Sequence, residues 1–106
     1  MTTQLSAYRF AVNVTPRPGI LDPQGRAVEQ SLPHLGVRDV SDVRVGRRVE
    51  LTVVAPDESD ARATVDRLAG ELLSNPLIET FVVELLQAPG GPGGESPGSA
   101  AMGERR

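Results

Sequence analysis

The sequence contains no cysteine, which excludes disulfide bonds, thiolate nucleophiles and zinc–thiolate sites. Aromatic residues make up only 3% of the chain, so valine and leucine must supply most of the apolar area of the core. All eleven basic residues are arginine, and the formal net charge is −3. This balance gives no broad attraction for a phosphate backbone, and we therefore expect no nucleic-acid partner.

Long hydrophobic runs are also missing. No apolar run reaches the roughly 18 residues that span a membrane, and the N-terminal sequence lacks the basic-then-apolar order of a signal peptide. These absences predict a cytoplasmic protein with no membrane partner. A chain of 106 residues is expected to form one domain with a thin core, because such a domain buries only about two-thirds of its unfolded surface. Self-association would bury additional apolar surface.

The first part of the chain predicts a strand and a helix. Apolar residues alternate from Tyr8 to Val14, as in a strand with one buried face. After a break rich in proline and glycine, Asp22 is placed to cap a helix whose first position is Pro23. The apolar stripe of this helix comprises Val28, Leu32 and Leu35, with Pro33 ending or bending it and Gly36 placed for a left-handed cap.

The second part predicts a hairpin, a helix and a strand. Alternating runs over 43–45 and 49–53 flank a tight connection at Gly46 and Arg47, with a bulge or bend near Ser41. The apolar stripe and acidic start of residues 57–75 predict a helix, and residues 77–86 alternate as a last strand. The expected element order is therefore β-α-β-β-α-β.

This order predicts an α+β fold, a two-layer sandwich with a four-stranded, mainly antiparallel sheet and two helices on one face, related to the ferredoxin-like folds. The domain should span residues 8–87, after an N-terminal segment at 1–7 and before a disordered, glycine- and proline-rich tail at 88–106. The uncovered face of the sheet should pack on a second copy or a partner, because it also carries Val54, Val82 and Leu86.

Residues able to carry catalysis are scarce. The single histidine, His34, follows a proline near a helix end, and we interpret it as a surface residue. Asp57, Glu58 and Asp60 could suggest a magnesium site, but acidic residues in a first helical turn are expected from the helix dipole alone. No glycine-rich phosphate-binding motif follows a strand, so no nucleotide site is indicated.

Two features leave alternatives open. The arginines at positions 44, 47 and 48 could bind carboxylates or phosphates bidentately, or could form a solvated turn with Arg44 opposite Glu50. Gly25 costs up to about 1 kcal/mol relative to alanine within a helix. Its missing side chain could let another backbone or subunit approach the helix start, or it could be neutral drift.

Four segments in this order and spacing resemble the PurS family, the small subunit of phosphoribosylformylglycinamidine synthase: ILDPQGRAV, DVSDVRVGR, VELTV and LLSNPLIETFVVEL. The resemblance covers about residues 8–86, and LDPQG followed some twenty residues later by DVRVG is a specific combination. It implies a non-catalytic subunit of purine biosynthesis that self-associates and bridges a glutaminase, PurQ, to a synthetase, PurL. ATP and magnesium would bind the synthetase, and this chain would hold no cofactor.

The same resemblance gives the candidate subunit-interface residues, which are Leu21, Asp22, Pro23, Gln24, Gly25, Arg44, Gly46 and Arg47. Arg47 stands where the family usually has lysine, and Pro33 falls where its first helix usually runs uninterrupted. Three other classes of protein share parts of the pattern: an ACT-like module that senses small molecules, an RRM-like nucleic-acid binder and an independent small enzyme. The second lacks the exposed aromatics and basic surface that it would need.

Overall fold

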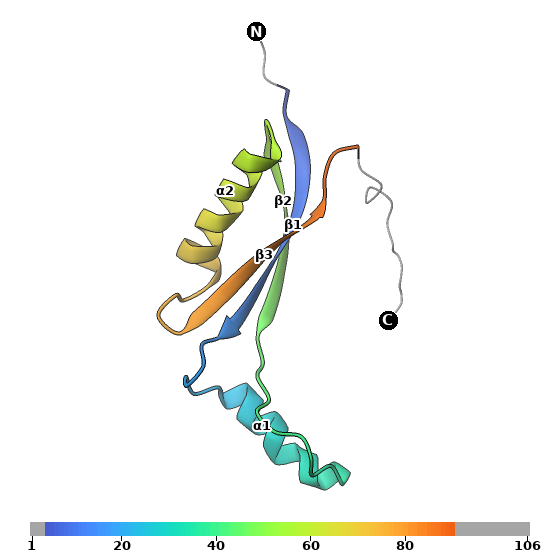
Figure 1. The fold of residues 1–106 in the computed structure, drawn as a ribbon, viewed down its shortest axis with the longest axis vertical. Helices are drawn as coiled ribbons and strands as arrows, with labels where there is room; N and C mark the ends of the chain where they lie inside the picture. The colour runs from blue at the N-terminus through green and yellow to red at the C-terminus, as the bar shows by residue number, and fades with distance from the viewer. Residues whose placement is uncertain (1–3, 91–106) are drawn as a thin grey trace.

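The computed structural model describes residues 4–90. Its elements in chain order are the strand β1 (Ser6–Pro16), the helix α1 (Pro23–Ser31), the 3-10 helix η1 (Leu32–Leu35), the strand β2 (Arg47–Ala55), the helix α2 (Glu58–Leu68), the π-helical turn η2 (Ala69–Leu73) and the strand β3 (Glu79–Gln87). α2 lies against the sheet, whereas α1 projects beyond one end of it (Figure 1). This α+β arrangement has two helices and an antiparallel sheet.

The sheet is built around β1. Its strand order is β2-β1-β3, and both neighbours run antiparallel to β1. Phe10 is paired with Leu51 on one side and Leu85 on the other, so the alternating apolar residues of all three strands share one face. The register with β3 shifts between Arg9 and Phe10, which places an irregularity near the end of that pairing.

The core lies between this apolar face and α2. Phe10, Val12 and Val14 are buried from the sheet side, and Ala61 and Val65 are buried from the helix side. None of the residues buried within the described range is polar or charged. The Arg62 guanidinium lies 5.5 Å from the centre of the Phe10 ring and covers its edge of the core.

The acidic start of α2 has a structural explanation. Asp57 is the N-cap, and its Oδ1 accepts a hydrogen bond of 2.8 Å from the Asp60 backbone N–H. Within residues 4–90, no group of three histidine, aspartate or glutamate side chains is placed to hold a metal ion. The same part of the chain has no helix long and apolar enough to cross a membrane.

The predicted hairpin and fourth strand are wrong. Residues 37–46, here called the 37–46 segment, form no strand in the sheet, which has three strands over residues 4–90. The chain bends at Asp42, where φ is +56°, close to the bulge or bend expected near Ser41. Gly46 makes no tight turn; a β-carbon there would overlap the Val14 carbonyl oxygen, so the missing side chain permits a close approach to β1.

The prediction of two helices on one face is also wrong. Gly25 is the one buried residue of α1, and Val28 of the predicted stripe is 43% exposed. The periodicity correctly predicted a helix, but it could not show which surface covers the stripe. The caps were predicted correctly: Asp22 accepts a hydrogen bond from Gly25 N–H, and Gly36 has a φ of +75°. Pro33 lies in η1, where the α-helix has already ended.

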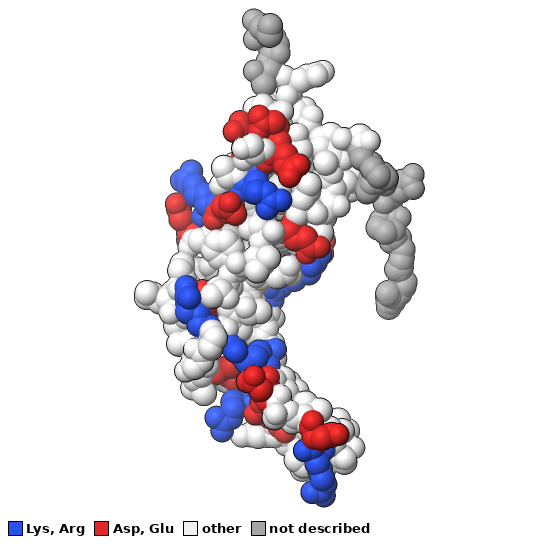
Figure 2. Space-filling model, viewed as in Figure 1, with Lys and Arg blue, Asp and Glu red and all other residues white. Residues whose placement is uncertain are grey.

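The other face of the sheet is open and mixed in character. Val54 and Val82 are 61% and 66% exposed there, as predicted. Of the two alternatives for the arginines, the one that places Arg44 opposite Glu50 is not found, because Glu50 contacts Arg9 and Arg48 and Arg44 donates to the Pro16 carbonyl oxygen. In the view of Figure 2, acidic and basic side chains are interspersed along the molecule without a broad region of one sign.

Candidate functional site

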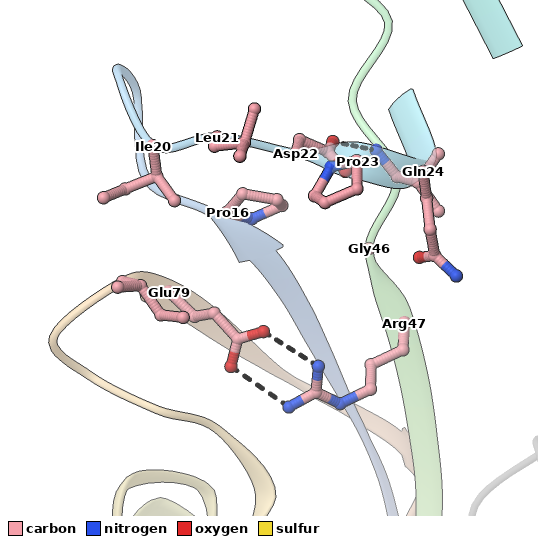
Figure 3. Close-up of a pocket in the computed structure, with 11 residues that line it drawn as sticks. Pro16, Ile20, Leu21, Asp22, Pro23, Gln24, Gly46, Arg47 and Glu79 are labelled. Carbon is pink, nitrogen blue, oxygen red and sulfur yellow. Dashed lines mark hydrogen bonds and ion pairs between the residues drawn. The ribbon is translucent and has the colours of Figure 1, made fainter. Parts of the chain in front are cut away.

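A cleft of about 610 Å³ lies where α1 meets the end of the sheet. We call it the α1–sheet cleft. It combines the end of β1, the start of α1, the start of β2 and the start of β3 (Figure 3). Six of the eight candidate interface residues line it: Leu21, Asp22, Pro23, Gln24, Gly46 and Arg47. The other lining residues are Pro16, Ile20, Val45, Ile78 and Glu79.

Asp22 connects α1 to the 37–46 segment. Its Oδ1 accepts the Gly25 N–H at 3.0 Å, and its Oδ2 accepts the Val45 N–H at 2.9 Å. These two backbone donors, Val45 first, lower the pKa of the Asp22 carboxyl below its usual value of 3.8. Asp22 is therefore ionised at neutral pH, and both of its oxygens accept hydrogen bonds from the backbone of its own chain.

Glu29 makes a second connection of the same kind, which the sequence analysis missed. Its Oε2 accepts the Val43 N–H at 2.8 Å. Asp22 and Glu29 thus hold alternate amides of one extended stretch, those of Val45 and Val43. The seven-residue spacing of the two acids places them two helical turns apart along α1, and this spacing was a signal in the sequence that could have suggested a shared role.

Gly25 and Arg44 lie beside the cleft rather than in its lining. A β-carbon at Gly25 would overlap the Val43 carbonyl oxygen, so the backbone that approaches the start of α1 belongs to the same chain. The expected approach of a neighbouring subunit at this glycine is therefore replaced by an internal contact. Arg44 donates to the Pro16 carbonyl oxygen and lines a smaller cleft of about 170 Å³ with Gly19, Arg26 and Asp42.

Arg47 and Glu79 form a bidentate ion pair between β2 and β3. The Arg47 guanidinium donates to the two Glu79 oxygens at 2.9 and 3.1 Å (Figure 3). It also donates to the Leu73 carbonyl oxygen at 2.6 Å. The Asn75 N–H adds a hydrogen bond of 2.7 Å to Glu79. Arg47 first and then the Asn75 amide lower the pKa of Glu79, and Glu79 in turn raises the pKa of Arg47.

The cleft therefore combines charged groups that already bind partners within the chain with exposed apolar side chains, since Leu21 is 72% exposed and Ile78 is 41% exposed. Such a surface suits recognition of another protein better than bond-making chemistry, because it offers apolar area and its charged groups are already paired. His34 lies apart from the cleft, exposed in η1.

The comparisons with known proteins agree on one family. The family model of PurS, phosphoribosylformylglycinamidine (FGAM) synthase, matches residues 9–87. The chain belongs to the PurS family. A PurS subunit of this synthase from Synechocystis is 43% identical over 79 residues, which cover 74% of this chain and 79% of that relative. The PurS subunit of Bacillus subtilis is 36% identical over 78 residues, covering 74% of this chain and 92% of the relative.

Solved PurS structures have the same fold. The PurS subunit of the synthase from Thermotoga maritima superposes with a TM-score of 0.70 at 31% identity, covering 78% of this chain and 95% of that chain. A chain in the structure of PurLQS from the same organism superposes with a TM-score of 0.69 at 31% identity, covering 76% of this chain and 98% of the other. The ACT-like alternative is not supported, since the matched relatives are synthase subunits.

Proposed function

We propose that this chain is the PurS subunit that bridges PurQ and PurL, with the α1–sheet cleft as part of its contact surface. The observation that carries the proposal is the position of the two PurS-like motifs. LDPQG and DVRVGR are some twenty residues apart in sequence, yet seven of their residues line one cleft. Packing alone does not require this placement, since Leu21 and Arg47 are exposed.

The PurLQS structure from Thermotoga maritima supports the partners. It contains a chain that this protein matches over 98% of its length. On this basis PurL and PurQ are the proposed partners, and the complex would convert formylglycinamide ribonucleotide to its amidine with glutamine and ATP. ATP and magnesium would bind the synthetase, this chain would contribute no catalytic residue, and the complex would work in the cytoplasm.

Self-association is the second part of the proposal. The open sheet face and α1 with η1 both leave apolar side chains exposed, among them Val82 at 66% and Leu35 at 75%. Burial of such groups is favourable by about 25 cal/mol per Å². A dimer or a tetramer would therefore stabilise a domain whose own core is thin.

Co-purification tests the partners directly. The full chain would be mixed with PurL and PurQ from the same organism, with and without ADP and glutamine, and the mass of the product measured. We expect a complex that contains all three chains. Recovery of this chain without either partner under every condition would contradict the proposal.

Activity assays test the bridging role. Arg47→Ala and Arg44→Ala should lower glutamine-dependent activity of the complex more than ammonia-dependent activity, because only the first needs PurQ to be coupled to PurL. Arg67→Ala is the matched control, since exposed Arg67 at the end of α2 pairs with Glu71 of η2 and neither residue lines the cleft. Equal losses in the two assays, or an equal effect of the control, would argue against a bridging cleft.

A further inference from the structure

The turn between η2 and β3 holds one leucine outside the protein. Leu77 is 85% exposed, more than any other large apolar residue among residues 4–90. In Figure 1 this turn lies at the end of the sheet from which α1 projects. Single exposed leucines are ordinary on protein surfaces, so exposure alone indicates nothing. Leu77 differs from such residues because many hydrogen bonds fix the turn that carries it.

Asn75 closes this turn from within. Its backbone carbonyl oxygen accepts the Ile78 and Glu79 N–H groups at 3.0 and 2.8 Å, and its side-chain Oδ1 accepts the Leu77 N–H at 3.2 Å. The Asn75 N–H donates in turn to the Glu79 carboxylate at 2.7 Å. Three consecutive backbone amides therefore bind one asparagine, and Leu77 is exposed on an ordered turn.

Arg17, directly after β1, fixes the same turn from outside. Its backbone N–H donates to the Ile78 carbonyl oxygen at 2.8 Å, and its Nε donates to the Pro76 carbonyl oxygen at 2.9 Å. One residue therefore holds the carbonyl groups on both sides of Leu77. A side chain presented on a backbone that is already ordered costs less conformational entropy when a partner binds it.

Arg17 also brings an unpaired charge to this surface. Its exposed guanidinium forms no ion pair within residues 4–90, whereas Arg47 of the cleft pairs with Glu79. The turn thus presents an apolar side chain beside a positive charge. The surface that complements it has an apolar pocket with a carboxylate at its edge.

We propose that Leu77 is an anchor for a different subunit of the complex, where it fills an apolar pocket whose edge carries a carboxylate for Arg17. This inference rests on the bridging function proposed above and names a contact within it. Leu77 directly precedes Ile78, which lines the α1–sheet cleft, so the anchor continues the surface proposed to contact the partners. A second copy fits less well, because a two-fold contact at this turn would bring two Arg17 charges together.

Truncation of the leucine tests the anchor. PurL and PurQ at fixed concentrations are titrated with the full chain, and glutamine-dependent activity gives the half-saturating concentration of the chain. Leu77→Ala should raise this concentration at least roughly tenfold, because a leucine that fills a pocket contributes that much to binding. Leu5→Ala is the matched control and should leave it unchanged, since Leu5 is 61% exposed but lies before the opposite end of β1.

Charge variants test the role of the guanidinium. Arg17→Gln keeps the backbone N–H and a side-chain donor but loses the charge, so it should raise the half-saturating concentration at low salt and flatten its dependence on salt. Arg17→Lys restores the charge and should restore most of the binding. Arg38→Gln is the control, because Arg38 is also exposed, forms no ion pair within residues 4–90 and lines neither cleft.

Three results would overturn the inference. The first is a Leu77→Ala titration that coincides with that of the unmodified chain or of Leu5→Ala. The second is an unchanged salt dependence in Arg17→Gln. The third is a lower mass of Leu77→Ala alone in sedimentation, which would assign the turn to contacts between copies. Normal binding of Leu77→Ala within a three-chain complex leaves the bridging function standing. Failure of the unmodified chain to join PurL and PurQ removes the bridging function and the anchor with it.

Discussion

The Asp22 carboxylate binds the Val45 backbone amide at 2.9 Å, across 23 residues of sequence. The same side chain caps α1 through Gly25, so one acid fixes both where the helix begins and how the chain returns to β2. This double role makes Asp22 the residue whose replacement reports most directly on the cleft.

Replacing Asp22 should separate its two roles. Asn can still accept the Gly25 N–H but presents an amide donor toward Val45, whereas Ala loses both contacts. We expect exchange of the Val45 amide to become severalfold faster in both Asp22→Asn and Asp22→Ala, and exchange of the Gly25 amide to accelerate only in Asp22→Ala. Hydrogen exchange followed by NMR measures both amides. An unchanged Val45 amide in either variant would contradict the role assigned to Oδ2.

The same contact should persist to low pH. Because the folded-state pKa of Asp22 is below 3.8, the ionised side chain contributes its full stabilisation above that pH and loses it as the pH falls through the folded pKa. The Val45 amide chemical shift should therefore stay constant from neutral pH downward and titrate with a midpoint below 3.8. A midpoint above 3.8 would show that the Val45 and Gly25 donors do not hold the charged form.

Glycine replacements should differ sharply at two helical positions. In Gly25→Ala the new β-carbon overlaps the Val43 carbonyl oxygen, and the local opening of the 37–46 segment should become easier by about 1–3 kcal/mol, measured by exchange of the Val43 and Val45 amides. Gly70→Ala is the control, since the nearest atom there is 4.0 Å away on Phe81. It should be neutral or stabilising by up to about 1 kcal/mol. Similar effects at both positions would refute the steric argument.

Truncating a valine to alanine should lower the free energy of unfolding when the valine is in the core, and should have little effect when it is on the open face of the sheet. Val65→Ala removes a fully buried side chain between α2 and β1 and should lower the free energy of unfolding by about 1–3 kcal/mol. Val82→Ala, at 66% exposure on the other face, should change it by less than about 0.5 kcal/mol. Urea denaturation at a protein concentration low enough to separate associated copies measures both. Equal losses at positions 65 and 82 under this condition would contradict the difference in burial.

Local chemistry made much of the fold predictable. The alternation of apolar residues correctly predicted β1 and β3. Asp22 and Asp57 correctly predicted the starts of α1 and α2, because capping depends on neighbours within three residues. The predicted hairpin was wrong. Val43 and Val45 alternate as residues of a strand do, but their amides bind the carboxylates of Glu29 and Asp22 instead of a neighbouring strand. Periodicity reports which residues face the same way, and it carries no information on the identity of the partner.

The candidate site was predicted in part for a similar reason. The motif residues Asp22 and Arg47 were identified in sequence, and the cleft brings them together. Glu29 and Glu79 were missed, because each acts through a contact with a residue distant in sequence, Val43 and Arg47 respectively. An acid on a helix or at a strand start has many ordinary explanations, and only the three-dimensional arrangement distinguishes them.

The central position of β1 has a consequence for biosynthesis. β1 is translated first, yet it pairs with β2 and β3, whose residues begin at Arg47 and Glu79. The nascent chain must therefore carry its most buried strand without its full set of neighbours until β3, which ends at Gln87, has left the ribosome. During that interval Phe10 and Val12 are open to aggregation, and chaperone demand should be greatest just before the last strand leaves the ribosome.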